Sequence, residues 1–228
     1  MALKFQKAVG KNCPNVSSDI IALHARLMEI AKIPCYECTG AMDDVILNGI
    51  LSVQGHFMRN PDGVISVDGR THEFLKVWSE KPVRSGAQLP GRLTEAWSLV
   101  NPLLPDGSAC TSGYRSPQDQ RRILHNFFLQ EYRVAIIKKY GAAAYDAACK
   151  NLTQNEQQVL DMVRGVGQQI ATPGKSRHQQ GKAVDVGGPS LIDQKQVDVI
   201  KLVAHAHPNL FSTTILKERN GCVHFEIH

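Results

Sequence analysis

The stretch Ala171–Val186, ATPGKSRHQQGKAVDV, decides how this chain is expected to be organised. Pro173-Gly174 is a turn signal. Lys182–Val186 alternates between polar and apolar residues, which is typical of a short strand. The stretch is therefore predicted to be a loop that carries the imidazole of His178 and returns as a strand with the carboxylate of Asp185.

This pair of residues points to a metal centre. Imidazole nitrogens and carboxylate oxygens both bind zinc, and a catalytic zinc usually has three protein ligands and one water. The natural third ligand is His224, in the apolar strand Cys222–Phe225 near the C-terminus. We therefore predict one Zn²⁺ ion bound by His178, Asp185 and His224. The alternative is a structural histidine and a surface aspartate.

Two blocks carry a resemblance to known families. Residues 176–185, SRHQQGKAVD, resemble the Ser-x-His-x-x-Gly-x-Ala-x-Asp signature of zinc D-alanyl-D-alanine carboxypeptidases and related L-alanyl-D-glutamate endolysins. Upstream, Ser112–Ser116 resembles a second carboxypeptidase block. These families are similar to lysostaphin-type peptidases and the Sonic hedgehog signalling domain. The resemblance implies a zinc metallopeptidase that cuts a bond in the stem peptide of peptidoglycan, as a carboxypeptidase or an endopeptidase.

The resemblance also implies roles for residues around the metal. Arg115 matches an arginine that faces the developing oxyanion or the substrate carboxylate, which suits its fixed fork of donors. A structural ion pair is the alternative for Arg115. Tyr114, Ser176 and Gln120 match positions linked to substrate binding.

The general base departs from the family pattern. The carboxypeptidases and endolysins place Glu or Asp three residues before the last zinc histidine, where this chain has Gly221. Lysostaphin-type sites use a histidine two residues before the ligand, where this chain has Cys222. Glu218 lies six residues before His224, at the spacing of the site glutamate in the Sonic hedgehog domain. We therefore predict Glu218 as the catalytic base.

Two further residues are alternatives for this role. Side chains alternate along a strand, so Glu226 should share a face with His224 and serve as the base or as a partner of an imidazole. His228 lies two residues further along the same face, at the chain terminus.

The first 78 residues are predicted to form a separate helical domain. Helices are expected up to Ile30 after an N-cap at Ser17–Asp19, from Asp43 to Phe57, and around His72–Leu75, after a turn at residues 60–63. In order, SDIIALH (18–24), LSVQGHF (51–57) and DGVI (62–65) resemble the small peptidoglycan-binding domain of wall hydrolases. An unrelated helical bundle is the alternative.

The rest of the chain is predicted to be a linker, residues 79–92, followed by a zinc peptidase domain, residues 93–228. Helices are expected at 94–100, from 117 towards Gly141, at 142–149, 154–164 and 191–205, with Thr94 and Thr153 as caps. Strands are expected at 182–186, 211–216 and 222–227. This pattern predicts an α+β fold, with helices flanking a small antiparallel sheet that carries the zinc site, preceded by the three-helix domain.

Composition restricts the partners of the protein. The chain has 228 residues, 43% of them hydrophobic, and a net charge of +5. It contains no dense basic block and no transmembrane stretch, so neither a nucleic-acid partner nor membrane insertion is expected.

No secretory signal is recognised at the N-terminus. We expect synthesis in the cytoplasm and action on peptidoglycan in the periplasm or cell wall. A phage endolysin released through a holin and an antibacterial effector, with a secretion apparatus and an immunity protein, both fit.

Two questions stay open at this point. Disulfides among Cys13, Cys35 and Cys38 and unpaired thiols are equally compatible with the sequence. The second function class is a zinc-containing cell-wall or protein binding module of the hedgehog type, without catalysis.

Overall fold

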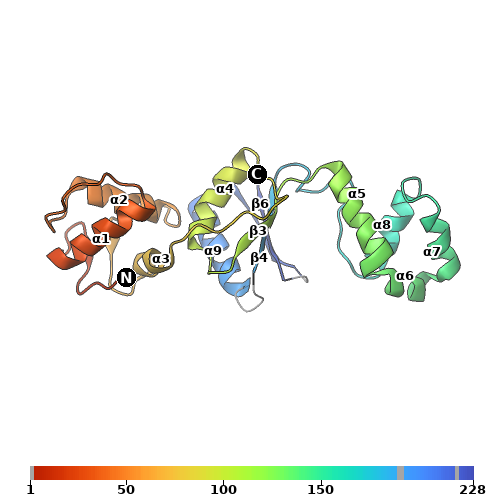
Figure 1. The fold of residues 1–228 in the computed structure, drawn as a ribbon, viewed down its shortest axis with the longest axis horizontal. Helices are drawn as coiled ribbons and strands as arrows, with labels where there is room; N and C mark the ends of the chain where they lie inside the picture. The colour runs from red at the N-terminus through yellow and green to blue at the C-terminus, as the bar shows by residue number, and fades with distance from the viewer. Residues whose placement is uncertain (1–2, 189–192, 219–220) are drawn as a thin grey trace. The chain divides into compact units, whose positions relative to one another are not determined.

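The computed structural model describes residues 3–188, 193–218 and 221–228. These residues fall into two compact units. One combines residues 1–112 with 184–228, and the other contains residues 113–183. Figure 1 labels helices and strands of both units.

The beginning of the first unit contains three helices, as predicted. These are α1 (Ser17–Ile30), α2 (Asp44–Gly55) and α3 (Arg70–Val77). A two-stranded antiparallel ribbon, β1 (Val9–Gly10) with β2 (Val64–Ile65), accompanies them and was not anticipated. The apolar faces that the sequence periodicity indicated are buried: Ile20, Leu23, Leu27, Ile46, Ile50 and Leu75 have no exposed surface.

A four-stranded sheet forms the remainder of the first unit, in the order β3-β4-β6-β5. Its strands are β3 (Ala109–Ser112), β4 (Ala183–Gly187), β5 (Phe211–Lys217) and β6 (Val223–Ile227). The β3–β4 and β5–β6 pairs are antiparallel. Strand β3 is an addition to the three strands predicted. Residues 82–84 run beside it, because Cys110 donates to the Pro82 carbonyl and accepts from Arg84.

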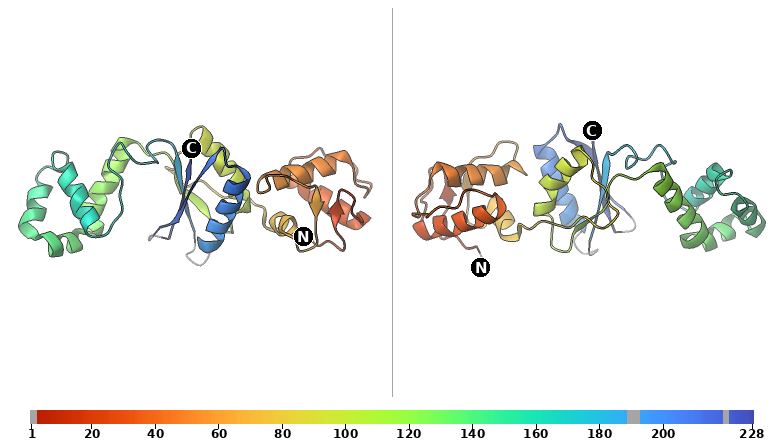
Figure 2. Two further views of the ribbon diagram at one scale, coloured as in Figure 1. Left: turned by 180° about the vertical axis from the view of Figure 1, so that it is seen from behind. Right: turned by 45° about the horizontal axis from the view of Figure 1, so that its top comes forward.

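Two helices pack on one side of this sheet (Figure 2). They are α4 (Arg92–Val100) and α9 (Asp193–Ala206), and a short 3₁₀ turn, η1 (Asn101–Leu103), follows α4. Leu93 and Val100 of α4 and Ile200 and Val203 of α9 are fully buried. These two positions are seven residues apart in α4 and three residues apart in α9, which places each pair on one side of its helix.

The second unit is mainly helical. It contains α5 (Pro117–Asn126), the π-helical turn η2 (Phe127–Glu131), α6 (Arg133–Tyr140), α7 (Ala142–Cys149) and α8 (Glu156–Gly165). Gly141 ends α6 with a positive φ of 86°, as its place in the sequence predicted. The unit has its own core, in which Phe128 stacks on Tyr145. Leu124, Ile136, Ala148, Val159, Leu160 and Val163 complete its fully buried part.

Three helix caps differ from the predictions. Helix α1 begins at Ser17 without a side-chain cap, and Asp19 instead accepts from the backbone amides of Gln6 and Lys7. Helix α4 begins at Arg92, before Thr94. Helix α8 begins at Glu156, beyond Thr153. In the first case a buried carboxylate gains more from two amides of the preceding segment than from its own helix terminus.

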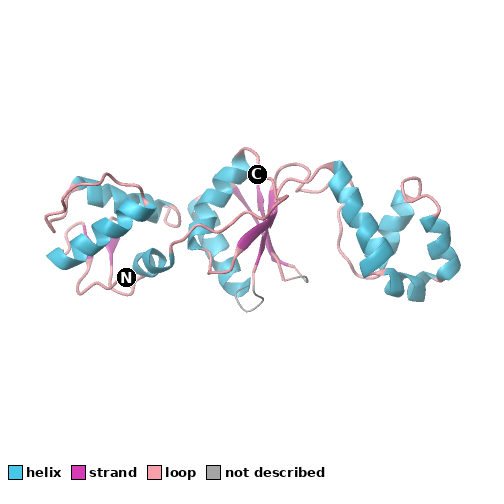
Figure 3. Ribbon diagram, in the orientation of Figure 1, coloured by secondary structure: helices cyan, strands magenta, loops and turns pink. Residues whose placement is uncertain are grey.

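The fold class was predicted correctly. Helices and small antiparallel sheets make an α+β protein, in which the helices outnumber the strands among the described residues (Figure 3). None of the helices in the described ranges has the length and apolarity required to span a membrane.

Candidate metal centre

Strand β4 positions Asp185. All five of its residues are buried, and Val184 and Val186 on either side of Asp185 have no exposed surface. Because strand side chains alternate, the carboxylate points to the face opposite these two valines. The hydroxyl of Thr111 on β3 donates to the Asp185 carbonyl over 3.1 Å. Asp185 itself is 5% exposed.

Strand β6 positions His224 in the same way. Val223, Phe225 and Ile227 are buried, so His224 and Glu226 share the other face of the strand. Nδ1 of His224 lies 2.9 Å from Oδ1 of Asp185. The strand neighbours β4 in the sheet, which explains how residues far apart in sequence meet.

His178 lies on the loop before β4. Its Nδ1 is 2.7 Å from the carbonyl oxygen of Gly113. A carbonyl only accepts, so Nδ1 carries the proton and Nε2 keeps a lone pair that can bind a metal. The hydroxyl oxygen of Ser176 accepts from the backbone amide of His178 over 3.3 Å. The imidazole is 5% exposed, and both contacts fix its loop.

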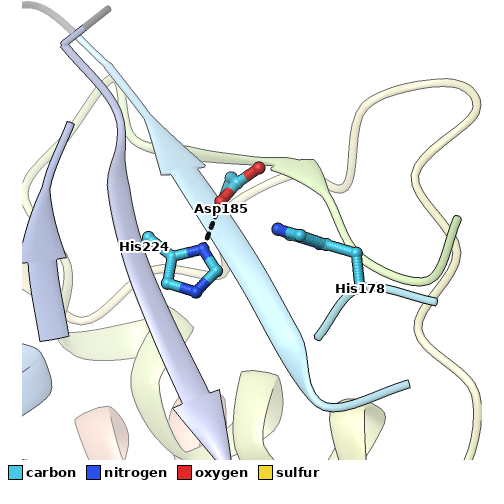
Figure 4. A group of neighbouring side chains, drawn as sticks. All are labelled: His178, Asp185 and His224. Carbon is cyan, nitrogen blue, oxygen red and sulfur yellow. Dashed lines mark hydrogen bonds and ion pairs between the residues drawn. The ribbon is translucent and has the colours of Figure 1, made fainter. Parts of the chain in front are cut away.

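The three predicted ligands converge (Figure 4). One ligand atom each from His178, Asp185 and His224 lies within 4.8 Å of the others, and all three residues are buried. Two imidazoles and one carboxylate are a donor set suited to zinc, with one position left for water. The fixed tautomer of His178 adds to this fit. The residues present therefore suit the ion that the sequence predicted.

The carboxylates around His224 raise the pKa of its imidazole. Burial by itself lowers the pKa of this imidazole, but the hydrogen bond and the charge of Asp185 outweigh that effect and raise the pKa. A hydrogen bond to Glu226 and the charge of Glu218 act in the same direction. The centre thus collects carboxylates around one imidazole, an environment that favours a cation.

Glu218 lies on the site face of the β5–β6 hairpin. Leu216 is paired with His224 across the two strands, and the Glu218 amide donates to the Cys222 carbonyl over 2.8 Å. Residues opposite each other share a face, and alternation places Glu218 on the face of Leu216 and His224. Gly221, with a positive φ of 82°, forms part of the connecting turn. A side chain at Gly221 would be strained, so an acid there is disfavoured.

Glu226 has a different contact. Its Oε1 lies 3.3 Å from Nε2 of His224. This contact orients the imidazole so that Nδ1 is directed towards Asp185. His228, the other alternative base, is exposed, and its backbone amide donates to the Leu210 carbonyl.

The residues expected to bind substrate lie in the second unit. The Arg115 amide donates to the His178 carbonyl over 3.2 Å, and Tyr114 precedes it as a half-buried residue. Gln120 on α5 is 2% exposed, and its Nε2 donates to the Ala171 carbonyl over 3.4 Å. Its Oε1 is buried and has no hydrogen-bond partner among the described residues. Ser176 is 5% exposed and supports the His178 loop.

None of the six cysteines forms a disulfide among the described residues. Two of them flank the centre. Burial raises the pKa of Cys110 to about 12, and the charge of Asp185 adds to this. Burial and the charges of Asp185 and Glu218 raise the pKa of Cys222, while its contact with Thr111 opposes the shift. Both thiols therefore stay protonated near neutral pH.

A second group of potential ligands, Asp68, His72 and Glu73, lies at the start of α3. Here both imidazole nitrogens contact backbone groups, whereas those of His224 contact side-chain carboxylates. Nδ1 of His72 accepts from the Asp68 amide over 2.9 Å, and Nε2 is 3.2 Å from the Leu3 carbonyl. Lys76 pairs with both carboxylates. This group is therefore structural.

Two supporting contacts were missed by sequence reasoning. The Gly113 carbonyl that fixes His178 and the Thr111 hydroxyl that holds β4 both come from β3 or the residue after it. A backbone carbonyl acts through its position and leaves no side-chain signal. The block at residues 112–116 was the only available sign that this segment belongs to the site.

The chain is thus an α+β protein in which His178, Asp185 and His224 could hold a metal ion. Residues 107–214 match the family model of VanY, described as D-alanyl-D-alanine carboxypeptidase. The match includes His178 and Asp185 and ends before His224. The match supports the expected family for this segment and suggests a peptidase that acts on peptidoglycan. The carboxypeptidase family is in general zinc-dependent, which agrees with the donor set of the candidate centre. Comparisons with curated proteins and with solved structures found no match.

Proposed function

We propose that the protein is a zinc-dependent peptidase that hydrolyses a bond in the stem peptide of peptidoglycan. The observation that carries this proposal is the convergence of His178, Asp185 and His224 within 4.8 Å. The first two of these residues lie in the segment that matches the carboxypeptidase family model. The donor set, the burial and the tautomer of His178 that its contact with Gly113 fixes all suit a catalytic metal.

When bound, zinc would supply a water molecule of lowered pKa and polarise the scissile carbonyl. Glu218 is the proposed general base, because it lies on the face of His224 and its charge acts on that imidazole. Glu226 is assigned to orienting His224, since its carboxylate already contacts Nε2. Arg115, fixed beside His178 through its backbone, is proposed to bind the substrate carboxylate or the developing oxyanion.

The remaining assignments complete the proposal. Ser176, Gln120 and Tyr114 would contact the stem peptide, and Gln120 offers a buried carbonyl oxygen for a donor. Residues 1–78 would form a wall-binding domain and residues 79–92 the linker to a peptidase domain of residues 93–228. Tethering the enzyme to an insoluble polymer raises its local substrate concentration. A phage endolysin and an exported antibacterial effector are the two proposed contexts.

One observation favours a second candidate. The family position of the base is Gly221, so a zinc-containing binding module without catalysis also fits the site. The two functions differ in what the loss of Glu218 does. A peptidase loses turnover and keeps its metal, whereas a binding module has no turnover to lose.

The test is mass spectrometry of purified stem-peptide fragments after incubation with the zinc-loaded protein. Release of the terminal D-alanine would identify a carboxypeptidase, and an internal cut would identify an endopeptidase. We expect Glu218→Gln to lower kcat by about 100-fold or more, the usual contribution of a positioned base, while zinc content is unchanged. Intact fragments from several wall chemotypes, with zinc bound, would contradict the enzymatic function.

A further inference from the structure

The net positive charge of this protein comes from the second unit. Residues 113–183 contain 11 lysines and arginines and 5 acidic residues, a net charge of +6. The whole chain contains 26 and 21, a net charge of +5, so the remaining residues have 15 and 16, a net charge of −1. The excess of cations therefore belongs to the unit that also contributes His178.

Within this unit, the metal-binding loop is purely cationic. Residues 171–183 include Lys175, Arg177 and Lys182 and no aspartate or glutamate. Each of these three cations is within four residues of His178. Since a residue spans at most ~3.6 Å along the chain, their Cα atoms lie within roughly 14 Å of that of His178.

Each of the two lysines follows a glycine that lies in open space. Lys175 follows Gly174 and Lys182 follows Gly181, and these glycines have positive φ values of 90° and 65°. No atom lies within 4 Å of a Cβ placed on either glycine. Lys175 is exposed and Lys182 is half-buried. Within the described ranges, neither lysine forms an ion pair.

Two arginines extend this charge. The Arg115 amide donates to the His178 carbonyl, so its backbone lies directly against that of the ligand. The Arg177 guanidinium donates to the side-chain Oε1 of Gln180 over 3.2 Å. Cations of one sign that line a binding site raise the local concentration of anionic ligands.

We propose that Lys175 and Lys182 select stem peptides that carry an additional free carboxylate over peptides in which that carboxylate is amidated. This inference rests on the proposed function and specifies its substrate as an acidic peptide. The lysines act on binding, because their charges attract the carboxylate before and during the reaction alike. The preference should therefore be found mainly in KM.

The experiment compares two soluble stem peptides that are identical except for one free carboxylate or primary amide outside the scissile bond. We expect the zinc-loaded protein to prefer the carboxylate form by about tenfold in kcat/KM, as a Coulomb interaction of ~1–2 kcal/mol implies. Raising the salt concentration should reduce this ratio, because mobile ions screen exposed charges. The double variant Lys175→Gln/Lys182→Gln should reduce it to near one.

The matched control is Lys195→Gln/Lys201→Gln. It removes the same charge from two exposed lysines of α9, outside the loop, and should keep the wild-type ratio. A wild-type ratio of one, or a double variant that keeps the preference, would overturn the inference.

Failure of the inference is distinguishable from failure of the proposed function. If the wild type cuts neither peptide, the enzymatic function fails, and equilibrium binding of the same two peptides decides the inference. Tighter binding of the carboxylate form, lost in the double variant, would sustain it. The inference is rejected if the two peptides bind equally and double-stranded DNA binds in a way that depends on the two lysines. The loop would then bind a polyanion.

Discussion

Nδ1 of His224 lies 2.9 Å from Oδ1 of Asp185, although 39 positions separate the two residues in the chain. The pair joins strands β6 and β4, which are neighbours in the sheet. His178, on the loop before β4, completes the group. A metal ion bound by these three residues would neutralise the buried carboxylate of Asp185. Without the ion, a proton on His224 is what balances that charge.

Replacement of Asp185 should remove the metal. Asp185→Asn keeps the size of the side chain but loses its charge, so we expect zinc affinity to fall by more than about 100-fold, beyond the effect of losing an outer contact. Competitive titration against a chromophoric chelator measures this. His205→Ala, at an exposed histidine of α9, is the control and should bind zinc like the wild type. Unchanged affinity in Asp185→Asn would rule out this residue as a ligand.

Glu226 should act through His224 and not on the substrate. Glu226→Ala removes the acceptor at 3.3 Å from Nε2, and we expect zinc affinity to fall by about 10–100-fold. Glu226→Gln retains an acceptor oxygen and should recover much of this loss. If Glu226→Ala instead keeps full zinc affinity and loses all turnover, Glu226 is the base and the assignment of Glu218 is wrong.

The core of the second unit should depend on Phe128. This side chain is fully buried and stacks on Tyr145 with ring centroids 4.8 Å apart. Phe128→Ala leaves a cavity, and we expect the free energy of unfolding to fall by about 3–5 kcal/mol. Urea denaturation monitored by circular dichroism measures it. Val134→Ala, at a side chain that is 80% exposed, should change stability by no more than about 0.5 kcal/mol.

Asp43 should stabilise α2 in a pH-dependent way. Its carboxylate accepts from the Ile46 amide over 2.8 Å, as the N-cap of the helix. Burial alone raises its pKa, but this hydrogen bond and that from the Tyr36 hydroxyl lower it below the usual value. We expect Asp43→Ala to cost about 1 kcal/mol at pH 7.

The direction of the pH effect follows from linkage. The folded-state pKa of Asp43 is lowered, so its contribution is present above the unfolded-state value of about 4 and is lost as pH falls through the folded-state value. Thermal melts of wild type and Asp43→Ala should differ at pH 7 and converge towards pH 2. A difference that grows as the pH falls would contradict this account.

Much of the fold was accessible from local patterns. Apolar residues at helical spacing identified α1, α2, α5 and α9, because burial of one helix face leaves a periodic record in the sequence. The caps were less predictable. Asp19 is found where a cap was expected, yet it binds the amides of Gln6 and Lys7, a contact between segments that local sequence does not encode.

The candidate ligands were likewise visible before the structure. His178 and Asp185 are seven residues apart in a recognisable block, and His224 lies in a terminal apolar strand. Glu218 and Glu226 could not be separated by spacing, because both are an even number of residues from His224. In the structure the two glutamates have different positions. Glu226 contacts Nε2 of His224. Glu218 lies across the hairpin, next to strand β6, which carries His224.

Residue types and their spacing along each helix, strand or loop can be read without a structure. The α+β class and the three expected ligands follow from them, since periodicity and donor chemistry are local properties. Three contacts came from the three-dimensional structure alone: β6 lies beside β4, the Gly113 carbonyl fixes the tautomer of His178, and Nδ1 of His224 lies next to Asp185. These contacts depend on strand order and register, which arise from packing of the whole sheet against α4 and α9.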